Sequence, residues 1–430
     1  MSSISKHELN LKMKKITHIL CVLTVLNACQ QATDTNETEQ DFVIDQTAKH
    51  RIDSTLQSFI ADSIVVGASA LIFEKGREVY FNAFGYADRE AEVPMARNTI
   101  VTIYSMTKPI TGTTLMTLYE KGAFQLEDPL SKYAPEFTDM QVATGLDESG
   151  EMVLKPANRA ITIADITRHT AGFSRRSDLG LDKIVEEADL LNMETSLTDM
   201  ATKLSNIPLG YQLGQRWEYG ISVDVQAYLT EKLAGKPFHE YMKEVVLDPL
   251  GMSETGYFVP EEKRDRVAAI YYKTDSSLNR IPDEQVHTIN YDDWPMKPGG
   301  WGLKATIDDY MNFAQMLVNE GTYNGATILK PETIKLMATN HLPAVEDSSW
   351  LPSKGRVGFG IDFAVRTTPP KTSEEMNGIV GEFFWDGAAS TLFWVDPKNE
   401  LTAVLFVQIM PFQRSVHKHF RDAVYGPFQP

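Results

Sequence analysis

Cysteine is nearly missing from this chain of 430 residues, which contains only Cys21 and Cys29. Because both lie close to the N-terminus, the residues after position 29 have no thiol for a disulfide, a nucleophile or a zinc site. The nine histidines also show no His-Glu-x-x-His or other metal-ligand spacing. We therefore expect a protein that uses neither a metal nor another cofactor.

Basic residues are outnumbered, because 41 lysines and arginines stand against 58 aspartates and glutamates, giving a formal net charge of −17. Such a charge repels phosphate backbones and anionic lipid headgroups, so we do not expect nucleic acid as a partner. The glycine-rich stretch Gly299 to Gly302 lacks the Gly-Lys-Ser/Thr ending of a phosphate loop. We expect a tight turn there, near a cleft.

The sequence also lacks a run of about 20 apolar residues, the length that spans a bilayer of roughly 30 Å. A shorter apolar stretch at 16–26 follows Lys14 and Lys15 and is typical of a signal peptide. It ends in Leu-Asn-Ala-Cys at 26–29, which resembles the lipobox of bacterial lipoproteins. The resemblance implies lipidation of Cys29 and a lipid anchor, its only membrane contact, in the bacterial cell envelope, facing the periplasm or exterior. The alternative is ordinary signal cleavage nearby, with Cys29 incidental.

After the signal peptide (1–29) and a polar, acidic segment (30–44) that reads as a flexible tether, one catalytic domain is predicted over 45–425. Helical and strand patterns alternate as follows: a helix at 44–61, strands at 65–73 and 78–83, mainly helices over 105–310, strands at 358–365, 390–395 and 402–408, and a helix at 414–424. Strands at both ends predict an α/β (α+β) fold: an antiparallel sheet flanked by helices and built from both chain ends. The sheet part covers about 45–110 and 297–425, and an inserted, mainly helical subdomain covers about 111–296. A cleft between the two parts is the natural place for an active site.

The first chemical motif is Ser105-Met106-Thr107-Lys108 at the start of an apolar helix. Residues three apart lie on one helical face, about 5–6 Å between Cβ atoms, so Lys108 can take the proton of Ser105. A lysine base must be neutral, which near pH 7 means lowering a pKa of about 10.4 by roughly three units, about 4 kcal/mol. Burial and a cationic or hydrogen-bonding neighbour would achieve this. Taken alone, the motif fits a helix-capping serine and a solvated lysine equally well.

Four stretches of the chain, at 98–129, 163–173, 208–252 and 298–303, resemble the β-lactamase-related serine hydrolases. This superfamily includes class C β-lactamases, D,D-peptidases and family VIII carboxylesterases. The resemblance covers about 45–425 in the expected order. It implies the serine β-lactamase and penicillin-binding-protein fold, with Ser105 as the nucleophile and Lys108 as its base.

The family's second motif, usually Tyr-x-Asn, matches Tyr219, which the resemblance implies shares the proton with Lys108. Ile221 replaces the usual asparagine, as in the esterase branch, and the neighbouring Ser222 is a candidate for the missing hydrogen bond and for substrate binding. The alternative reading of Tyr219 is an ordinary half-buried aromatic residue.

The third family motif, Lys-Thr-Gly on an edge strand, is replaced by Trp385-Asp386-Gly387, which resembles the Trp-x-Gly of the esterase branch. The resemblance implies a substrate-binding role for this motif and an oxyanion hole formed by the backbone N–H groups of Ser105 and Ala388. Such donors contribute roughly 3–4 kcal/mol to catalysis. Gly387 would permit close backbone approach by a substrate. Trp385 could instead be a packing residue beneath the sheet edge.

Replacing the family lysine removes a cation, and Asp386 adds a carboxylate. Two like charges at ~4–6 Å repel by about 2–4 kcal/mol at an effective dielectric near 20. We therefore expect discrimination against anionic substrates, unless Arg175 or Arg176 restores a positive charge. The prediction is a serine hydrolase that forms an acyl-enzyme, a carboxylesterase on small neutral esters. The alternatives are a D,D-peptidase or D-aminopeptidase on amides, a weak β-lactamase, or an inactive penicillin-binding-like protein.

Overall fold

The computed structural model describes residues 42–342 and 350–429, and Val43–Pro430 is one compact unit. The predicted signal peptide, Cys29 and nearly all of the predicted tether lie outside the described residues. Among the described residues, no helix is both long and apolar enough to cross a membrane.

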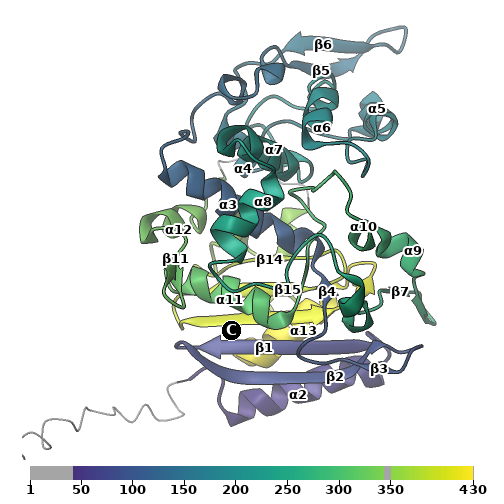
Figure 1. Ribbon diagram of the computed structural model, residues 1–430, viewed down its shortest axis with the longest axis vertical. Coiled ribbons are helices and arrows are strands. Elements are labelled where there is room, and N and C mark those ends of the chain that lie inside the picture. Colours follow the sequence, from purple (N-terminus) through teal and green to yellow (C-terminus); the bar gives the residue numbers. More distant parts are fainter. Residues whose placement is uncertain (1–41, 343–349, 430) are drawn as a thin grey trace, which may run out of the picture. The chain divides into compact units, whose positions relative to one another are not determined.

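An antiparallel sheet of eight strands is the main framework of the described part of the chain (Figure 1). In spatial order its strands are β12 (Val357–Phe359), β13 (Ala364–Arg366), β14 (Phe383–Asp386), β15 (Leu392–Asp396), β16 (Leu401–Val407), β1 (Gly67–Glu74), β2 (Arg77–Asp88) and β3 (Val93–Pro94). The N-terminal strand β1 pairs with the C-terminal strand β16 from Ala68 opposite Val407 to Glu74 opposite Leu401. This pairing confirms the predicted antiparallel sheet built from both chain ends.

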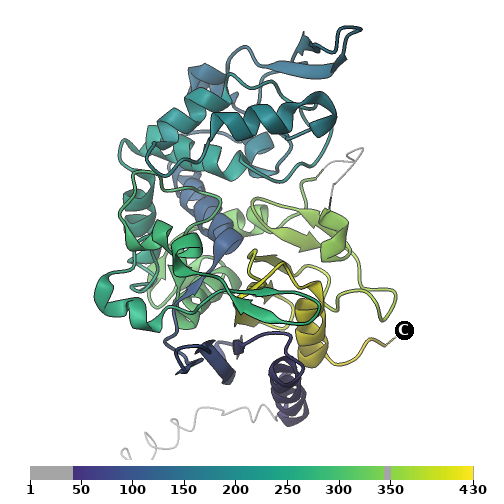
Figure 2. The same cartoon turned by 90° about the vertical axis from the view of Figure 1, so that its right-hand side faces the viewer.

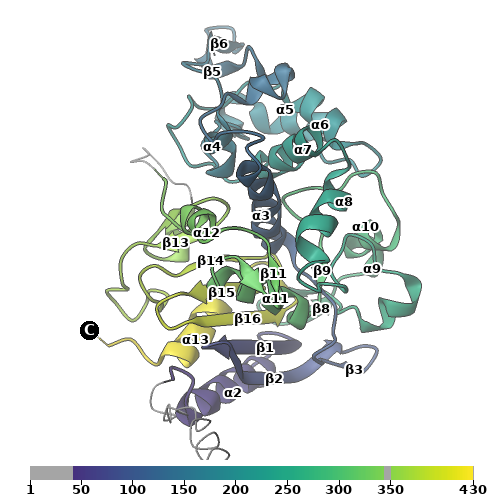
Figure 3. The same ribbon diagram turned by 60° about the vertical axis from the view of Figure 1, so that its left-hand side comes forward.

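Helices cover both faces of the sheet (Figure 3). Side chains of one strand point alternately to the two faces, so a single strand packs against helices on both sides. On β15, Phe393 packs against Tyr310 of α11 (Ile307–Val318), with ring centroids 4.9 Å apart. The next residue, Trp394, packs on the other face against Phe420 of α13 (Arg414–Tyr425), at 5.6 Å. Strands buried on both sides read as continuous apolar runs, as β16 does.

Helix α2 (Gln46–Ala61) packs against α13 and against β1 and β2. It begins where the Asp45 side chain accepts a hydrogen bond from the Ala48 N–H, a typical N-cap. Its buried residues, Ala48, Ile52, Leu56 and Phe59, recur every three or four positions and form one apolar stripe. The predicted helix at 44–61 is therefore confirmed with an end shifted by two residues.

A mainly helical part lies between the strands of the sheet in sequence and contains the teal segments in Figure 2. Its helices are α3 (Thr107–Glu120), α4 (Ile163–Thr167), α5 (Leu181–Ala188), α6 (Leu197–Leu204), α7 (Ser222–Ala234), α8 (Phe238–Met242), α9 (Asp283–Val286) and α10 (Thr288–Tyr291). The region also contains strands that the sequence reading missed: the hairpin β5 (Gln141–Leu146) and β6 (Met152–Pro156), and β7 (Tyr271–Lys273) with β8 (Leu278–Arg280). These strands are short and partly exposed, so they lack the apolar runs that mark the main sheet.

The predicted strand at 358–365 is wrong, because the chain turns within it. Gly360 donates its N–H to the Phe363 carbonyl, and Asp362 has a left-handed backbone with φ of 58°. The segment is therefore a hairpin of β12 and β13. Further short elements are β4 (Val101–Thr102) paired with β9 (Lys304–Ala305), β10 (Thr322–Tyr323) paired with β11 (Ala326–Thr327), β17 (Ile409–Met410) beside β7, and helix α12 (Pro331–Met337).

Candidate active site

Ser105 lies in a single 3₁₀ turn, Tyr104–Met106, between β4 and α3. The turn is constrained on both sides: β4 pairs with β9, and the Met106 carbonyl accepts a hydrogen bond from the Tyr310 hydroxyl at 2.8 Å. Tyr104 has a φ of 45°, a left-handed conformation that costs a non-glycine residue about 1–3 kcal/mol. Such strain often accompanies a functional residue held in place by its surroundings, and here it immediately precedes Ser105.

Lys108 lies in the first turn of α3 and is buried. Its Nζ is 3.3 Å from the Ser105 Oγ, as the three-residue spacing predicts, and it donates to the Gly300 carbonyl at 2.6 Å. Gly300 belongs to the glycine-rich stretch expected near the cleft. The glycine-rich turn thus holds the Lys108 amine beside the Ser105 hydroxyl.

Tyr219 precedes α7 and stands beside this pair. The Lys108 Nζ lies 4.6 Å from the centre of the Tyr219 ring, and the indole N–H of Trp385 donates to the Tyr219 hydroxyl at 3.1 Å. His169 and Trp350 contact the ring, at centroid distances of 4.8 and 5.1 Å. The phenol is therefore held within an aromatic cluster with its oxygen bound by a donor.

Trp385 and Ser222, both predicted to bind substrate, are buried. Trp385 is 1% exposed, so its ring offers almost no surface to a substrate, and it contacts Tyr219 instead. Ser222 begins α7. Within residues 42–342 and 350–429, its hydroxyl makes no hydrogen bond to Ser105, Lys108 or Tyr219, and so does not replace the asparagine of the family motif.

The predicted effect of Asp386 on the cleft is wrong, because its carboxylate is buried and paired. Lys354 donates to it, and His417 Nδ1 lies 3.8 Å away. Lys354 is itself buried, with its Nζ over the ring of Phe412 at 4.2 Å. Since a buried ion pair presents no net charge, Asp386 does not repel anions as a free carboxylate would. The partner lies 32 positions away in sequence, and nothing in the motif itself signals it.

The chain's own backbone requires glycine at position 387. A Cβ at this position would lie 2.5 Å from the Ile103 carbonyl oxygen and closer still to the Thr391 hydroxyl. The residue that follows β14 therefore packs directly against Ile103, which lies between β4 and the turn that contains Ser105. In addition, β14 is not an edge strand, because the β12–β13 hairpin continues the sheet beyond it. Strand β13 pairs only with Phe383 and Phe384 of β14.

This close approach bears on the predicted oxyanion hole. Ala388, which follows Gly387, is exposed. In the part of the chain that the structure describes, neither its N–H nor that of Ser105 donates a hydrogen bond to another residue. Two unpaired N–H groups on segments in contact are what an oxyanion hole requires.

Asp224, which the sequence reading missed, lies behind Lys108. It is 3% exposed on α7, and its Oδ1 accepts the Gly300 N–H at 3.0 Å. A Cβ on Gly300 would lie 3.1 Å from both the Asp224 Oδ2 and the Lys108 Nζ, so the carboxyl group and the amine flank the same backbone. Burial raises the pKa of Asp224 to about 6, although the charge of Lys108 opposes the shift.

Asp362 and His169 are two further buried titratable groups near Lys108. Burial raises the pKa of Asp362 to about 8, so it is a neutral acid at pH 7, and it accepts a hydrogen bond from Gln226 at 3.1 Å. Burial also lowers the pKa of His169 well below its ordinary value, which keeps the ring neutral. The neighbours of Lys108 thus include a carbonyl that accepts its hydrogen bond and carboxyl groups. Among the described residues, they do not include a cationic neighbour, which is one of the ways to keep a lysine neutral.

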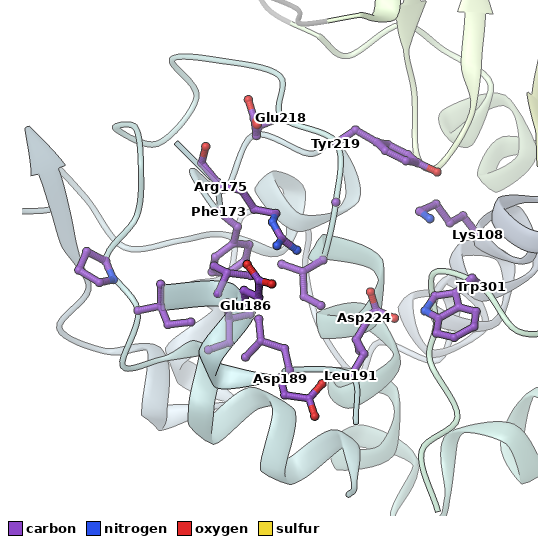
Figure 4. A pocket seen from close by; sticks show the side chains of 18 residues that line it. Lys108, Phe173, Arg175, Glu186, Asp189, Leu191, Glu218, Tyr219, Asp224 and Trp301 are labelled. Atoms are coloured by element: carbon purple, nitrogen blue, oxygen red, sulfur yellow. The ribbon is translucent and has the colours of Figure 1, made fainter. Parts of the chain in front are cut away.

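A cavity of about 540 Å³ begins at Lys108, Tyr219 and Asp224 and extends into the helical part (Figure 4). We call it the side pocket. Most of its wall is apolar and comes from the loops and helices around α5 and α6: Phe173, Val185, Leu190, Leu191, Leu204 and Ile207. Trp301 and Ile221 also line it. Of the two arginines considered above, Arg175 lines the side pocket, whereas Arg176 pairs with Asp178.

Across the described ranges, no three histidine, cysteine, aspartate or glutamate residues are grouped so that they could hold a metal ion.

Comparisons with known proteins indicate the family of the chain. A family model described as beta-lactamase matches residues 52–425. Protein Rv1367c of Mycobacterium tuberculosis is 31% identical over 354 residues, which are 81% of this chain and 87% of that protein.

Two further matches have described activities. Esterase EstB of Burkholderia gladioli is 27% identical over 397 residues, which are 87% of this chain and 95% of that protein. The solved structure of EstCE1, described as a hydrolase with promiscuous acyltransferase activity, superposes with a TM-score of 0.72 at 25% identity. That match covers 89% of this chain and 99% of the other.

Proposed function

This chain belongs to the β-lactamase family, and we propose that it is a carboxylesterase that hydrolyses neutral esters through an acyl-enzyme on Ser105. Esterases and a hydrolase with acyltransferase activity among its relatives support serine hydrolase chemistry in general. The observation that carries the proposal is that Lys108 lies beside both Ser105 and Tyr219, with its Nζ 3.3 Å from the serine oxygen and 4.6 Å from the centre of the tyrosine ring.

In the first step, Ser105 Oγ attacks the ester carbonyl carbon while its proton passes to Lys108 and Tyr219. Negative charge develops on the carbonyl oxygen, where the N–H groups of Ser105 and Ala388 stabilise it. The alcohol then leaves with a proton from Tyr219. Water then attacks the acyl carbon and loses a proton to the same pair. The bond to Ser105 Oγ breaks, the acid leaves, and the pair returns the proton to Oγ, which regenerates the serine.

Trp385 assists as a positioning residue, because its N–H fixes the phenol oxygen. A hydrogen bond donated to the phenol oxygen also stabilises that oxygen when it carries negative charge. Lys108, close to the ring, acts in the same direction while it is protonated. The proton taken from Ser105 is therefore shared between Lys108 and Tyr219, which are already in position, and is not held by the lysine alone.

Preference for uncharged substrates now rests on different residues from those that the sequence suggested. Lys354, a cation in contact with the motif, is paired with Asp386 and so is not available to bind a substrate carboxylate. The side pocket is mainly apolar, and carboxyl groups outnumber cations among its lining residues. This arrangement favours neutral esters over penicillins and peptide C-termini, both of which carry a carboxylate.

The test compares p-nitrophenyl acetate with the cephalosporin nitrocefin at equal concentrations, in the wild type and in Ser105→Ala. The proposal expects the ester to be hydrolysed faster and the variant to lose at least about 10³-fold in kcat. Faster hydrolysis of nitrocefin would favour the lactamase alternative, and no turnover of any substrate would favour the inactive, penicillin-binding-like alternative.

We also propose that Cys29 is lipidated and anchors the enzyme in the cell envelope, as the lipobox-like sequence predicts. In bacteria fed a labelled fatty acid, the wild type should take up label and fractionate with membranes. Cys29→Ser should not take up label, whereas Cys21→Ser, the matched control, should. Equal labelling of the two variants would contradict the anchor.

A further inference from the structure

We propose that the side pocket binds a bulky, apolar, uncharged substituent of the ester, so that the enzyme prefers substrates well beyond acetate esters in size. The inference rests on the proposed function, because it concerns the same Ser105. It replaces the expectation of small substrates with a defined binding site.

Position is the first argument. The side pocket starts at Lys108 and Tyr219, the residues that exchange protons with the reacting serine, and it runs away from them between the segment containing Phe173 and helix α5 (Figure 4). An ester whose carbonyl carbon is at Ser105 can therefore extend one of its two ends into the side pocket without leaving the site.

The chemistry of the wall is the second argument. Leu190, Leu204 and Ile207 are buried in the protein and yet line this cavity, and the half-buried Leu191 and Val185 extend the same surface. Burial of apolar ligand area against such a wall contributes about fourfold in binding for each methylene group, equivalent to about 0.8 kcal/mol.

Size is the third argument. A volume of about 540 Å³ falls within the range of roughly 300–1,000 Å³ that is typical of pockets for drug-sized ligands. An acetyl group would leave most of it unfilled. A substrate that fills the pocket gains binding energy remote from the reacting atoms, which an enzyme can use to raise the rate.

Charge restricts the end of the substituent. The charged lining residues include two cations and four carboxyl groups, and the rest of the lining is mainly apolar: Lys108, Arg175, Glu186, Asp189, Glu218 and Asp224 are the charged members. A terminal carboxylate would lose its hydration there and meet more carboxylates than cations. The substituent should therefore be uncharged along its whole length.

Helix α5 provides a matched pair of positions for the test. Val185 lines the side pocket, whereas its neighbour Ile184 is 37% exposed on the outside of the same helix. Tryptophan at 185 fills the cavity, and tryptophan at 184 adds the same bulk outside it. Leu191→Trp is a second filling variant on a different segment, which guards against a folding defect peculiar to α5.

The experiment measures kcat/KM for two series of esters: p-nitrophenyl esters from acetate to octanoate, and acetate esters from methyl to octyl alcohol. One series extends the acyl end and the other the alcohol end. In the wild type, lengthening at least one end from two to six carbons should raise kcat/KM at least about tenfold. Val185→Trp and Leu191→Trp should abolish that rise, and Ile184→Trp should keep it.

A flat response to length in both series, or a rise that survives both filling variants, would overturn this proposal while leaving the esterase function intact. Absence of any ester hydrolysis, together with no covalent labelling of Ser105 by a fluorophosphonate, would instead overturn the proposed function and this inference with it. Loss of acetate hydrolysis in both filling variants, with Ile184→Trp still active, would also contradict the proposal, because the pocket would then not be separate from the reacting groups.

Discussion

On the sheet side of the site, Gly387 packs against the Ile103 carbonyl, Trp385 is 1% exposed and bonded to Tyr219, and Asp386 is buried in an ion pair with Lys354. On the helical side, the side pocket is bordered by half-buried residues such as Val185 and Leu191, which make few directional contacts. The first surface fixes atoms in place, whereas the second offers apolar area. We therefore expect the sheet side to fix the Tyr219 hydroxyl and the oxyanion donors, and the pocket on the helical side to determine the choice of substrate.

The largest effect is expected at the point where the sheet side is tightest. In Gly387→Ala, the added methyl group would overlap the Ile103 carbonyl and push Ala388 away from Ser105. Loss of one oxyanion donor should lower kcat by about 10²–10³-fold. Steady-state kinetics with p-nitrophenyl acetate would measure it.

Gly145→Ala on β5 is the control for Gly387→Ala, because nothing lies within 4 Å of the Cβ that it would add and it lies outside the site, so it should change kcat less than about threefold. Comparable losses in the two variants would show that the tight contact at Gly387 does not hold the oxyanion donors.

The indole N–H of Trp385 should matter more than its bulk. Trp385→Phe keeps an aromatic ring but removes the hydrogen bond to the Tyr219 hydroxyl, worth about 0.5–1.5 kcal/mol, and should lower kcat by up to about tenfold with little change in KM. Trp350→Phe changes a neighbouring ring of the same aromatic cluster and should have a smaller effect. If the losses are equal, or if only KM changes in Trp385→Phe, Trp385 acts through packing alone.

Much of the framework was predictable, because its signals are local. Long apolar strands at both ends of the chain predicted the sheet, and the three-residue spacing of Ser105 and Lys108 predicted their contact. Asp224, Asp362 and Lys354 were not predictable, because single charged residues carry no periodic pattern and only the tertiary fold buries them. The turn at Asp362 was missed for a related reason: its left-handed backbone is not marked by a glycine or proline at that position.

Asp224 should control the acid side of the pH profile. Its pKa is raised by burial to about 6, so it loses its charge as the pH falls below that value and becomes a weaker acceptor for the Gly300 N–H. The Gly300 carbonyl, which holds Lys108, is then less firmly fixed. In the wild type, kcat/KM should fall below about pH 6. In Asp224→Asn, we expect a plateau about three- to tenfold lower, equivalent to about 0.7–1.4 kcal/mol, with no inflection near pH 6.

If Asp224→Asn keeps the inflection near pH 6, a different group causes the fall of kcat/KM at low pH. The comparison with Ser222→Ala, on the same turn of α7, controls for disturbance of the helix start, and that variant should keep the wild-type profile.

The smallest effect on activity is expected at Asp362, although its effect on stability should be clear. Burial raises its pKa from 3.8 to about 8, so protonation favours the folded state, and that contribution is complete below about pH 4 and is lost as the pH rises through 8. Asp362→Asn, a neutral side chain of the same shape, should avoid the loss. Relative to the wild type, it should gain up to about 1.4 kcal/mol in the free energy of unfolding for each pH unit between 4 and 8.

Urea unfolding of the wild type and Asp362→Asn at pH 5 and pH 8 measures this difference. A free-energy gap that is the same at both pH values would show that Asp362 is not a buried neutral acid at pH 7.

The most direct test of the account is the site of covalent labelling by a fluorophosphonate, mapped by mass spectrometry of the digested protein. A phosphonyl group on Ser105, absent from Ser105→Ala and formed more slowly in Tyr219→Phe, is the predicted result. Labelling of a different residue, or ester hydrolysis that persists at the wild-type rate in Ser105→Ala, would contradict it.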